Sequence, residues 1–227
     1  MDNNSALVLL SGGQDSTTCL YWAKQKFKDV RALNIWYGQR HAVEVNAAKK
    51  IAYLAESPYI DFKTTLFQEI GDSALIQSGE VSTCHRGSDK LPASFVPGRN
   101  IVFLTIAAMI AYKHGVHNIV TGVSQSDYSG YPDCRDNTIK SLQITLSLAM
   151  DYPLEIHTPL MNKTKKETVE MALGFIGCGE ALSWSHTCYE GKVPPCGKCP
   201  ACILREKGFD EAGIEDPLLT RLKGEKY

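Results

Sequence analysis

The sequence has no apolar run that is long enough to cross a lipid bilayer. Its longest run, residues 101–112, falls short of the roughly 20 residues that a membrane helix needs, and it is better interpreted as a buried helix. The sequence also has no excess of basic residues, since 24 Lys and Arg stand against 25 Asp and Glu, for a formal net charge of −1. Strong nucleic-acid binding depends on neutralising many phosphates, so this balance disfavours it. We expect neither a membrane nor a nucleic-acid partner.

The beginning of the chain has no segment that resembles a secretion signal. Residues 1–5 are polar and acidic, whereas a signal peptide starts with basic residues followed by an apolar stretch. We therefore expect a cytoplasmic protein. In that reducing compartment the eight cysteines are not expected to form a disulfide framework. Clustered cysteines there indicate a metal site, and scattered ones indicate core packing or catalysis.

The composition is that of an ordinary globular protein, with 227 residues of which 44% are apolar and 22% charged, and without repeats or low-complexity tracts. Short apolar runs alternate with helical patterns along the chain. This order predicts a Rossmann-like α/β fold with a doubly wound, mostly parallel sheet. The expected strands are residues 6–10, 30–36, 59–62, 118–121 and 154–157, and the expected helices are one that ends at residue 26, residues 41–55, 100–114 and 137–150, and one from about residue 164.

Two segments interrupt this alternation. Residues 71–99 lose periodicity and are rich in Gly, Ser, Asp and Pro, which is typical of a long functional or mobile loop without regular structure. After residue 176 the composition changes, because four Gly, three Pro and five Cys fall within residues 177–202. We therefore divide the chain into a main domain, residues 1–176, and a small metal-binding appendage with a helical tail, residues 177–227.

A glycine turn joins the first expected strand to the first expected helix, at the usual ligand crevice of a doubly wound sheet. Residues 11–16 read Ser-Gly-Gly-Gln-Asp-Ser, which matches neither the G-x-G-x-x-G fingerprint nor a Walker loop. Exposed backbone N–H groups and a helix N-terminus suit a phosphate. The motif resembles the pyrophosphate loop of the ATP pyrophosphatases, which split ATP between the α and β phosphates. The alternative is a tight turn in which Asp15 or Ser16 only caps the helix.

Four cysteines near the carboxyl end have the spacing of a metal site. Cys188, Cys196, Cys199 and Cys202 follow the pattern C-x7-C-x2-C-x2-C. Short x2 spacings let thiolates face one tetrahedral ion, and four sulfurs leave no position for water, so we predict structural Zn²⁺. An iron–sulfur cluster is the alternative. Cys19 lies among apolar neighbours and is expected to pack in the core.

Three further segments suit a substrate pocket at the carboxyl ends of the strands. Residues 95–100 bring an arginine and an asparagine to a helix start, and residues 127–136 combine aromatic, acidic and basic side chains. Residues 159–167 place lysines at a helix start, where positive charges are unfavourable because they oppose the helix dipole. One explanation is that a lysine binds phosphate, and the alternative is a solvent-exposed basic helix end. We expect Arg99 and Arg135 to clamp a carboxylate or phosphates. We expect Tyr131 to stack on a base and Asp133 to accept a hydrogen bond from a ring N–H.

Together these segments closely resemble the 7-cyano-7-deazaguanine synthases, or preQ0 synthases, of queuosine biosynthesis. The resemblance rests on residues 10–20, 37–41, 95–100 and 129–136 and on the four-cysteine loop, and it covers about residues 6–204. It implies a C–N-forming ligase in which ATP activates the carboxylate of 7-carboxy-7-deazaguanine as an adenylate. Ammonia then gives the amide, and a second activation gives the nitrile. It also implies Mg²⁺, one structural Zn²⁺ per chain and a homodimer.

The resemblance also implies roles for individual residues. It makes one segment the ATP-binding segment: Leu10, Ser11, Gly12, Gly13, Gln14, Asp15, Ser16, Thr17, Thr18, Cys19 and Leu20. Among three neighbouring lysines, Lys165 best matches a lysine of the family pattern, with Lys163 and Lys166 beside it. The expected catalytic set is Ser11, Asp15, Ser16, Arg99 and Lys165, and the expected substrate-binding set is Arg99, Asn100, Tyr131, Asp133 and Arg135.

Two other functions stay open at this point. A tRNA-modifying enzyme of the same ATP superfamily, such as a tRNA thiolation enzyme or a lysidine synthase, would share the glycine turn. Such an enzyme needs a polynucleotide surface, which the near-neutral charge disfavours. A zinc-ribbon binding module with a regulatory ATP site would bind ATP or a partner without releasing AMP.

Overall fold

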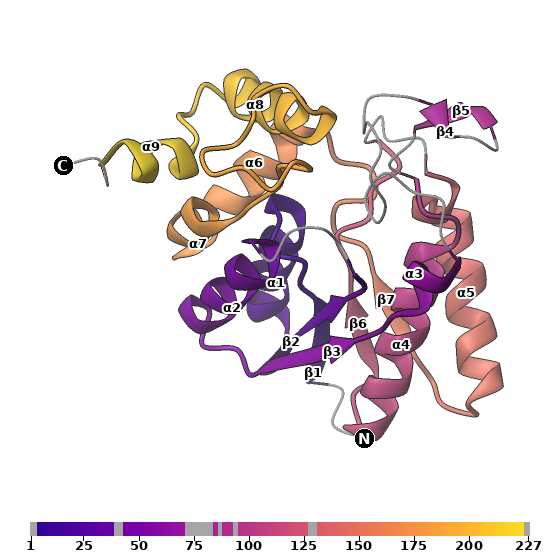
Figure 1. Ribbon diagram of the computed structural model, residues 1–227. Coiled ribbons are helices and arrows are strands. Elements are labelled where there is room, and N and C mark those ends of the chain that lie inside the picture. The colour runs from indigo at the N-terminus through magenta and orange to yellow at the C-terminus, as the bar shows by residue number, and fades with distance from the viewer. Residues whose placement is uncertain are drawn as a thin grey trace.

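The computed structural model describes residues 4–38, 43–70, 84–85, 88–92, 95–126 and 131–224. A five-stranded parallel sheet runs through the molecule (Figure 1), with the strand order β3-β2-β1-β6-β7. The order reverses between β1 and β6, and in a doubly wound sheet such a reversal marks the ligand crevice. The strands are β1 (Ser5–Leu9), β2 (Asp29–Trp36), β3 (Tyr59–Lys63), β6 (Asn118–Val120) and β7 (Glu155–His157).

The central strand β1 is apolar on both of its faces. Ala6, Leu7 and Val8 are all buried, and Leu7 stands opposite Arg31 of β2 and Ile119 of β6. A strand that is covered on both faces needs a continuous apolar run rather than an alternating one. The predicted strand at residues 6–10 is therefore confirmed with a shift of one residue.

Helices cover both faces of the sheet, which confirms the doubly wound α/β fold (Figure 1). Successive strand side chains point to opposite faces, so Val8 packs in one core cluster and Leu7 in the other. The first cluster is covered by α1 (Gln14–Lys26), α2 (Val43–Leu54) and α6 (Lys165–Leu173), and the second by α4 (Arg99–Lys113) and α5 (Asp136–Ala149).

Between β3 and α4 the structure contains short elements that the sequence pattern did not predict. They are helix α3 (Leu66–Ile70) and an antiparallel pair, β4 (Cys84–His85) and β5 (Ser88–Pro92). The prediction of a loop without regular structure is therefore wrong for the two strands, and most of the remainder of that loop lies outside the described residues. Elements of two to five residues are shorter than the window over which periodicity is read.

The C-terminal part of the chain adds α7 (Cys178–Trp184), α8 (Pro200–Ala212) and α9 (Pro217–Gly224). Leu182 of α7 and Phe209 of α8 are buried in the same core cluster as residues of α1 and α2. The domain division after residue 176 stays a prediction, and both sides of it contribute to one core. In the part of the chain that the structure describes, we find no helix with the length and hydropathy of a membrane span.

Candidate functional site

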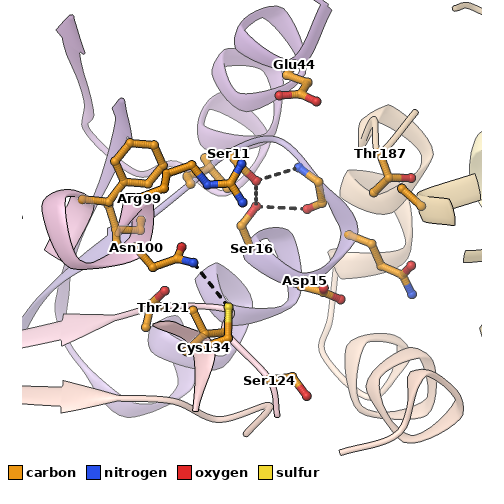
Figure 2. A pocket seen from close by; sticks show the side chains of 18 of the residues that line it. Ser11, Asp15, Ser16, Glu44, Arg99, Asn100, Thr121, Ser124, Cys134 and Thr187 are labelled. Atoms are coloured by element: carbon orange, nitrogen blue, oxygen red, sulfur yellow. Dashed lines mark hydrogen bonds between the residues drawn. The ribbon is translucent and has the colours of Figure 1, made fainter. Parts of the chain in front are cut away.

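A pocket of about 330 Å³ lies at the carboxyl ends of β1, β2 and β6 (Figure 2). Three parts of the chain line it: the glycine loop at residues 11–16, the first turn of α4, and the C-terminal part between residues 186 and 205. This is the crevice in which the sequence analysis expected the ligand. The pocket therefore joins residues that lie far apart in the sequence.

The backbone of the glycine loop packs directly against α2. Gly12 has a φ of +93°, and a Cβ atom on it would lie 2.4 Å from the carbonyl oxygen of Glu44 and 2.8 Å from the backbone nitrogen of Ala48. This position therefore requires glycine. The Gly12 carbonyl also accepts a hydrogen bond of 2.8 Å from the backbone N–H of His186. The loop is thus held between α2 and the C-terminal part.

Two serines of the loop are hydrogen-bonded to each other (Figure 2). Ser11 Oγ lies 3.0 Å from Ser16 Oγ, and Ser16 Oγ donates to the carbonyl of Gly13 at 3.0 Å. Helix α1 begins at Gln14, with Gly13 as its N-cap residue and no side chain bonded to the helix start. The alternative in which Asp15 or Ser16 only caps the helix is therefore wrong. The first N–H groups of α1 stay available as phosphate donors.

Lys165 and Asp15 form an ion pair at the edge of the loop. Lys165 Nζ lies 2.7 Å from Asp15 Oδ2, and both side chains are mostly shielded from solvent. The first turn of α6 holds the lysine in place, because Thr164 and Glu167 form a reciprocal capping box. Gly208 of α8 lets that helix approach, since a Cβ atom there would lie 2.9 Å from Lys165 Cβ. The cation at this helix start is thus neutralised by a carboxylate of the glycine loop.

Arg99 lies at the start of α4 among three tyrosines. Its guanidinium carbon is 5.8 Å from the ring centres of both Tyr37 and Tyr131, and Nη1 donates a hydrogen bond of 3.3 Å to the Tyr37 hydroxyl. Tyr189 reaches this place from the C-terminal part and is hydrogen-bonded to Tyr131. Burial raises the pKa of Tyr37 and of Tyr189, against the opposing charge of Arg99. The phenols of Tyr37 and Tyr189 therefore stay neutral and do not cancel the positive charge that Arg99 offers to a ligand.

Glu44 is a pocket residue that the sequence analysis did not single out. It lies in the first turn of α2, half-buried, and lines the pocket together with Arg99. Burial raises the pKa of its carboxyl from 4.5 to about 7, although the charge of Arg99 lowers it. Within the described residues this carboxylate has no hydrogen-bond partner. Its one signal in the sequence is an acid at a helix start, which is an ordinary feature of helices.

The four C-terminal cysteines come together in space. The Sγ atoms of Cys188, Cys196, Cys199 and Cys202 all lie within 4.8 Å of one another, and Cys196 Sγ is 3.9 Å from Cys202 Sγ. Four thiolates bound to one tetrahedral ion at about 2.3 Å would lie about 3.8 Å apart. The cluster therefore fits a four-sulfur metal site. It adjoins the pocket, because the residue after Cys188 is the pocket residue Tyr189.

A family model described as "Queuosine biosynthesis protein QueC" matches residues 5–213. The chain belongs to the QueC family. A 7-cyano-7-deazaguanine synthase of Chromobacterium violaceum is 54% identical over 226 residues, which cover 98% of this chain and 96% of the relative. Proteins of the same name from Laribacter hongkongensis (52%, covering 98% and 97%) and Bacteroides fragilis (50%, covering 93% and 97%) are also similar.

Solved structures with low sequence identity share the fold of this QueC family chain. The crystal structure of a 4-thiouridine synthetase in complex with RNA and ATP has a TM-score of 0.53 and 19% identity, over 98% of this chain and 53% of that one. The U34-tRNA thiolase NcsA from Methanococcus maripaludis, with its [4Fe-4S] cluster, has a TM-score of 0.50 and 13% identity, over 99% and 72%. At such identities they bear on the fold alone.

Most of the residues predicted for catalysis, ATP binding and substrate binding in this QueC family chain line the pocket. In addition, the Asn100 side chain donates a hydrogen bond of 3.3 Å to Cys134 Sγ, another lining residue (Figure 2). The predicted residues in the lining are Leu10, Ser11, Gly13, Gln14, Asp15, Ser16, Arg99, Asn100, Tyr131 and Lys165.

Two predicted substrate residues lie outside the pocket lining. Asp133, in the short 3-10 helix η1 (Pro132–Cys134), is buried, and its Oδ2 accepts a hydrogen bond of 2.9 Å from the Asn100 backbone N–H. It therefore satisfies the start of α4. Arg135 is exposed to solvent. The composition of this loop pointed to both residues, but the local backbone directs them elsewhere.

The later residues of the predicted ATP segment also lie outside the lining, because α1 turns them into the core. They are Thr17, Thr18, Cys19 and Leu20, all fully buried. Burial raises the pKa of the Cys19 thiol well above its ordinary value, and the nearby Asp15 and Cys178 raise it further. A thiol in this state is unreactive, so Cys19 packs in the core, as predicted.

The structure adds pocket residues that the sequence analysis missed. Asn34 of β2 is buried in the pocket wall, donates from Nδ2 to the Leu10 carbonyl at 2.7 Å, and has no partner for Oδ1 among the described residues. A polar residue within an apolar strand is a readable signal for such a position. Thr187 and Tyr189 carried no such signal, because only the fold of the C-terminal part brings them to the pocket.

Proposed function

We propose that this chain is a 7-cyano-7-deazaguanine synthase, an ATP-dependent C–N ligase that converts 7-carboxy-7-deazaguanine and ammonia into the nitrile in queuosine biosynthesis. Membership of the QueC family and identities of 50% to 54% to relatives of that name support this proposal. The observation that carries it is the pocket. It brings the glycine loop and Lys165 together with Arg99 and its tyrosines, so that phosphate groups and an organic acid can meet.

The glycine-loop side of the pocket suits the phosphates of ATP. The free N–H groups at the start of α1, the hydroxyls of Ser11 and Ser16, and the Lys165 ammonium are donors for the α phosphate and the departing pyrophosphate. Asp15 Oδ1, which has no hydrogen-bond partner among the described residues, is an oxygen ligand of the kind that Mg²⁺ prefers. Bound Mg²⁺ would screen the phosphate charge at this carboxylate.

The opposite side of the pocket suits the deazapurine acid. The guanidinium of Arg99 would neutralise the substrate carboxylate, and the ring of Tyr131 offers a face for stacking on the deazapurine. The Asn100 amide extends the same wall. Adenylation then replaces a poor leaving group, the carboxylate oxygen, by AMP, which ammonia displaces.

We assign one structural Zn²⁺ per chain to the four cysteines. A closed shell of four thiolates leaves the ion no water to activate, so its contribution is to hold the loop that carries Thr187 and Tyr189 against the pocket. Metal analysis by mass spectrometry distinguishes this assignment from the iron–sulfur alternative. The family resemblance is the basis for ammonia as the nitrogen donor and for a homodimer. The molecular mass of the protein in solution tests whether it is a dimer.

The test of the proposed function is product formation. Purified protein incubated with ATP, Mg²⁺, ammonium and 7-carboxy-7-deazaguanine is expected to form the nitrile, detected by its mass, together with AMP and pyrophosphate. Asp15→Ala is expected to slow this reaction by about 100-fold or more, because it removes the carboxylate that pairs with Lys165 and offers an oxygen to Mg²⁺.

The matched control is Asp210→Ala, which removes an exposed carboxylate from α8 and is expected to leave the rate unchanged. Nitrile formation at the normal rate by Asp15→Ala would overturn the role given to the glycine loop. ATP binding without AMP release would instead indicate a binding module.

A further inference from the structure

Glu44 lines the pocket from α2, and in Figure 2 its side chain lies above Ser11 and Arg99. Its backbone carbonyl packs on Gly12 of the glycine loop. Its carboxylate interacts electrostatically with the charge of Arg99. If the α phosphate binds at the loop and the substrate carboxylate at Arg99, the bond between them forms beside Glu44. We propose that Glu44 is the base that accepts the protons lost from nitrogen as the amide becomes the nitrile. This inference rests on the proposed function and adds a catalytic residue to it.

The chemistry of the second half-reaction requires such an acceptor. The amide oxygen attacks the α phosphorus of ATP, pyrophosphate leaves, and the nitrogen loses one proton, which gives an O-adenylated imidate. The C–O bond of the imidate then breaks, AMP leaves with the former amide oxygen, and the nitrogen loses its second proton as the C≡N bond forms. Each proton passes to a base that returns it to water. No oxidant or reductant takes part.

The other acidic side chains near the pocket are already engaged. Asp15 is paired with Lys165 at 2.7 Å, and Asp133 accepts from the start of α4. Tyr37 and Tyr189 remain protonated, because burial raises the pKa of both side chains. Among the described residues that line the pocket, Glu44 is therefore the carboxylate without a partner of its own.

The surroundings of Glu44 suit proton transfer near neutral pH. A half-buried carboxyl whose pKa burial raises to about 7, against the opposing Arg99, is both a competent acceptor and easily regenerated. The charged and titratable groups that line the pocket around it are Asp15, Tyr37, Arg99, Tyr131, Cys134, Lys165, His186, Tyr189 and Arg205.

The experiment starts from the amide rather than from the acid, so that the titration of ammonia does not enter. The rate of nitrile formation from the amide and ATP is measured between about pH 5.5 and pH 8.5 for the wild type, Glu44→Gln and Glu44→Asp. The wild-type rate is expected to rise with pH through an apparent pKa near 7. Glu44→Gln is expected to lose this limb and to be about 100-fold slower or more. Glu44→Asp is expected to keep the limb and recover at least part of the rate.

Two controls separate a chemical role from a structural one. Glu180→Gln changes an exposed acid in the first turn of α7 and is expected to leave rate and pH profile unchanged. Adenylation of the carboxylic acid substrate needs no proton acceptor at nitrogen. Its rate is measured as the exchange of pyrophosphate into ATP that depends on this substrate, and Glu44→Gln is expected to change that rate by less than about threefold.

Three results would overturn the inference. The first is a Glu44→Gln variant with an unchanged rate and acid limb. The second is an equal loss in adenylation and in nitrile formation, which would indicate a structural or magnesium-binding role. The third is a wild type that forms no nitrile from either the acid or the amide, and only this result also overturns the proposed function.

Discussion

Gly12 lies where the glycine loop and α2 approach each other most closely. Its φ of +93° is unfavourable for any side chain, and an added Cβ atom would meet backbone atoms of Glu44 and Ala48, which cannot move independently of their helix. We predict that Gly12→Ala lowers the free energy of unfolding by about 3 kcal/mol or more and weakens ATP binding. Urea denaturation and nucleotide titration measure the two effects.

The matched substitution is Gly98→Ala, at the N-cap of α4. Gly98 also has a positive φ, +69°, but an added Cβ atom there would meet nothing within 4 Å. Gly98→Ala is expected to lower the free energy of unfolding by about 1 kcal/mol, because only the backbone conformation is unfavourable for a side chain. Equal costs for the two substitutions would contradict the argument from close approach at Gly12.

Glu44 is also expected to make stability depend on pH. Burial raises its pKa from 4.5 to about 7 in the folded protein, so the folded state binds this proton more tightly than the unfolded state does. Protonation of Glu44 therefore adds to the free energy of unfolding in full below about pH 4.5, and this contribution is lost as the pH rises through about 7. Glu44→Gln removes this loss. We predict that its melting temperature exceeds that of the wild type at about pH 8 and that the difference shrinks toward pH 5, as measured by calorimetry. A difference that grows toward low pH would be the wrong sign.

At the scale of elements, a buried ion pair joins the helices of the C-terminal part. Arg205 of α8 donates from Nε and Nη2 to both carboxylate oxygens of Asp216, at 2.6 and 2.8 Å, and from Nη1 to Ser185 Oγ at 2.8 Å. Asp216 also accepts from the Leu218 backbone N–H at the start of α9. Removing one partner leaves a buried charge unpaired. We predict that Asp216→Ala lowers the free energy of unfolding, measured by urea denaturation, by about 3 to 5 kcal/mol.

The neighbouring exposed pair provides the comparison. Lys223 Nζ lies 2.7 Å from a Glu215 carboxylate oxygen, but both side chains are mostly in solvent. Glu215→Ala is therefore expected to cost less than about 1 kcal/mol. Similar costs for Asp216→Ala and Glu215→Ala would show that burial of the ion pair contributes little.

The sequence predicted the strands of the central sheet, including the short β6 and β7, and missed short elements outside that sheet. Continuous apolar runs identified the central strand and α4, and a period of 3.6 identified α2, because burial imposes those patterns. The helix expected from about residue 164 is confirmed as α6, with Thr164 in a capping box at its start. Helix α3 and the pair β4–β5 were missed because so few residues carry no period.

The same contrast holds for the site. Residues that act through the local backbone, such as those of the glycine loop, are readable from their motif. Glu44 and Tyr189 reach the pocket only because α2 and the C-terminal part fold over it. Asp133 and Arg135 were selected by composition, and composition does not reveal that the carboxylate of Asp133 satisfies the start of α4.

At the scale of the whole molecule, the four-cysteine cluster connects the C-terminal part to the pocket through Tyr189. We predict one zinc ion per chain by metal analysis. Cys199→Ser is expected to lose that ion, to lower the melting temperature by several degrees and to raise KM for the deazapurine acid more than it lowers kcat. The reason is that Tyr189 would no longer be held beside Tyr131.

The control uses a cysteine outside the cluster. Cys178 is buried in the core, where burial raises the pKa of its thiol to about 12. Cys178→Ala is expected to affect stability through packing while the zinc content stays at one per chain. Loss of zinc from this variant as well would mean that the metal site depends on overall folding rather than on its own ligands.

Leu10 and Arg205 line the same pocket, although one stands near the beginning of the sequence and the other near its end. A ribosome adds about 5 to 20 residues per second, so roughly ten to forty seconds separate the synthesis of these two walls. During that interval the glycine loop is already made while the wall that carries His186 and Tyr189 is not. The growing chain therefore has no complete binding site until the segment that ends at Arg205 has been made.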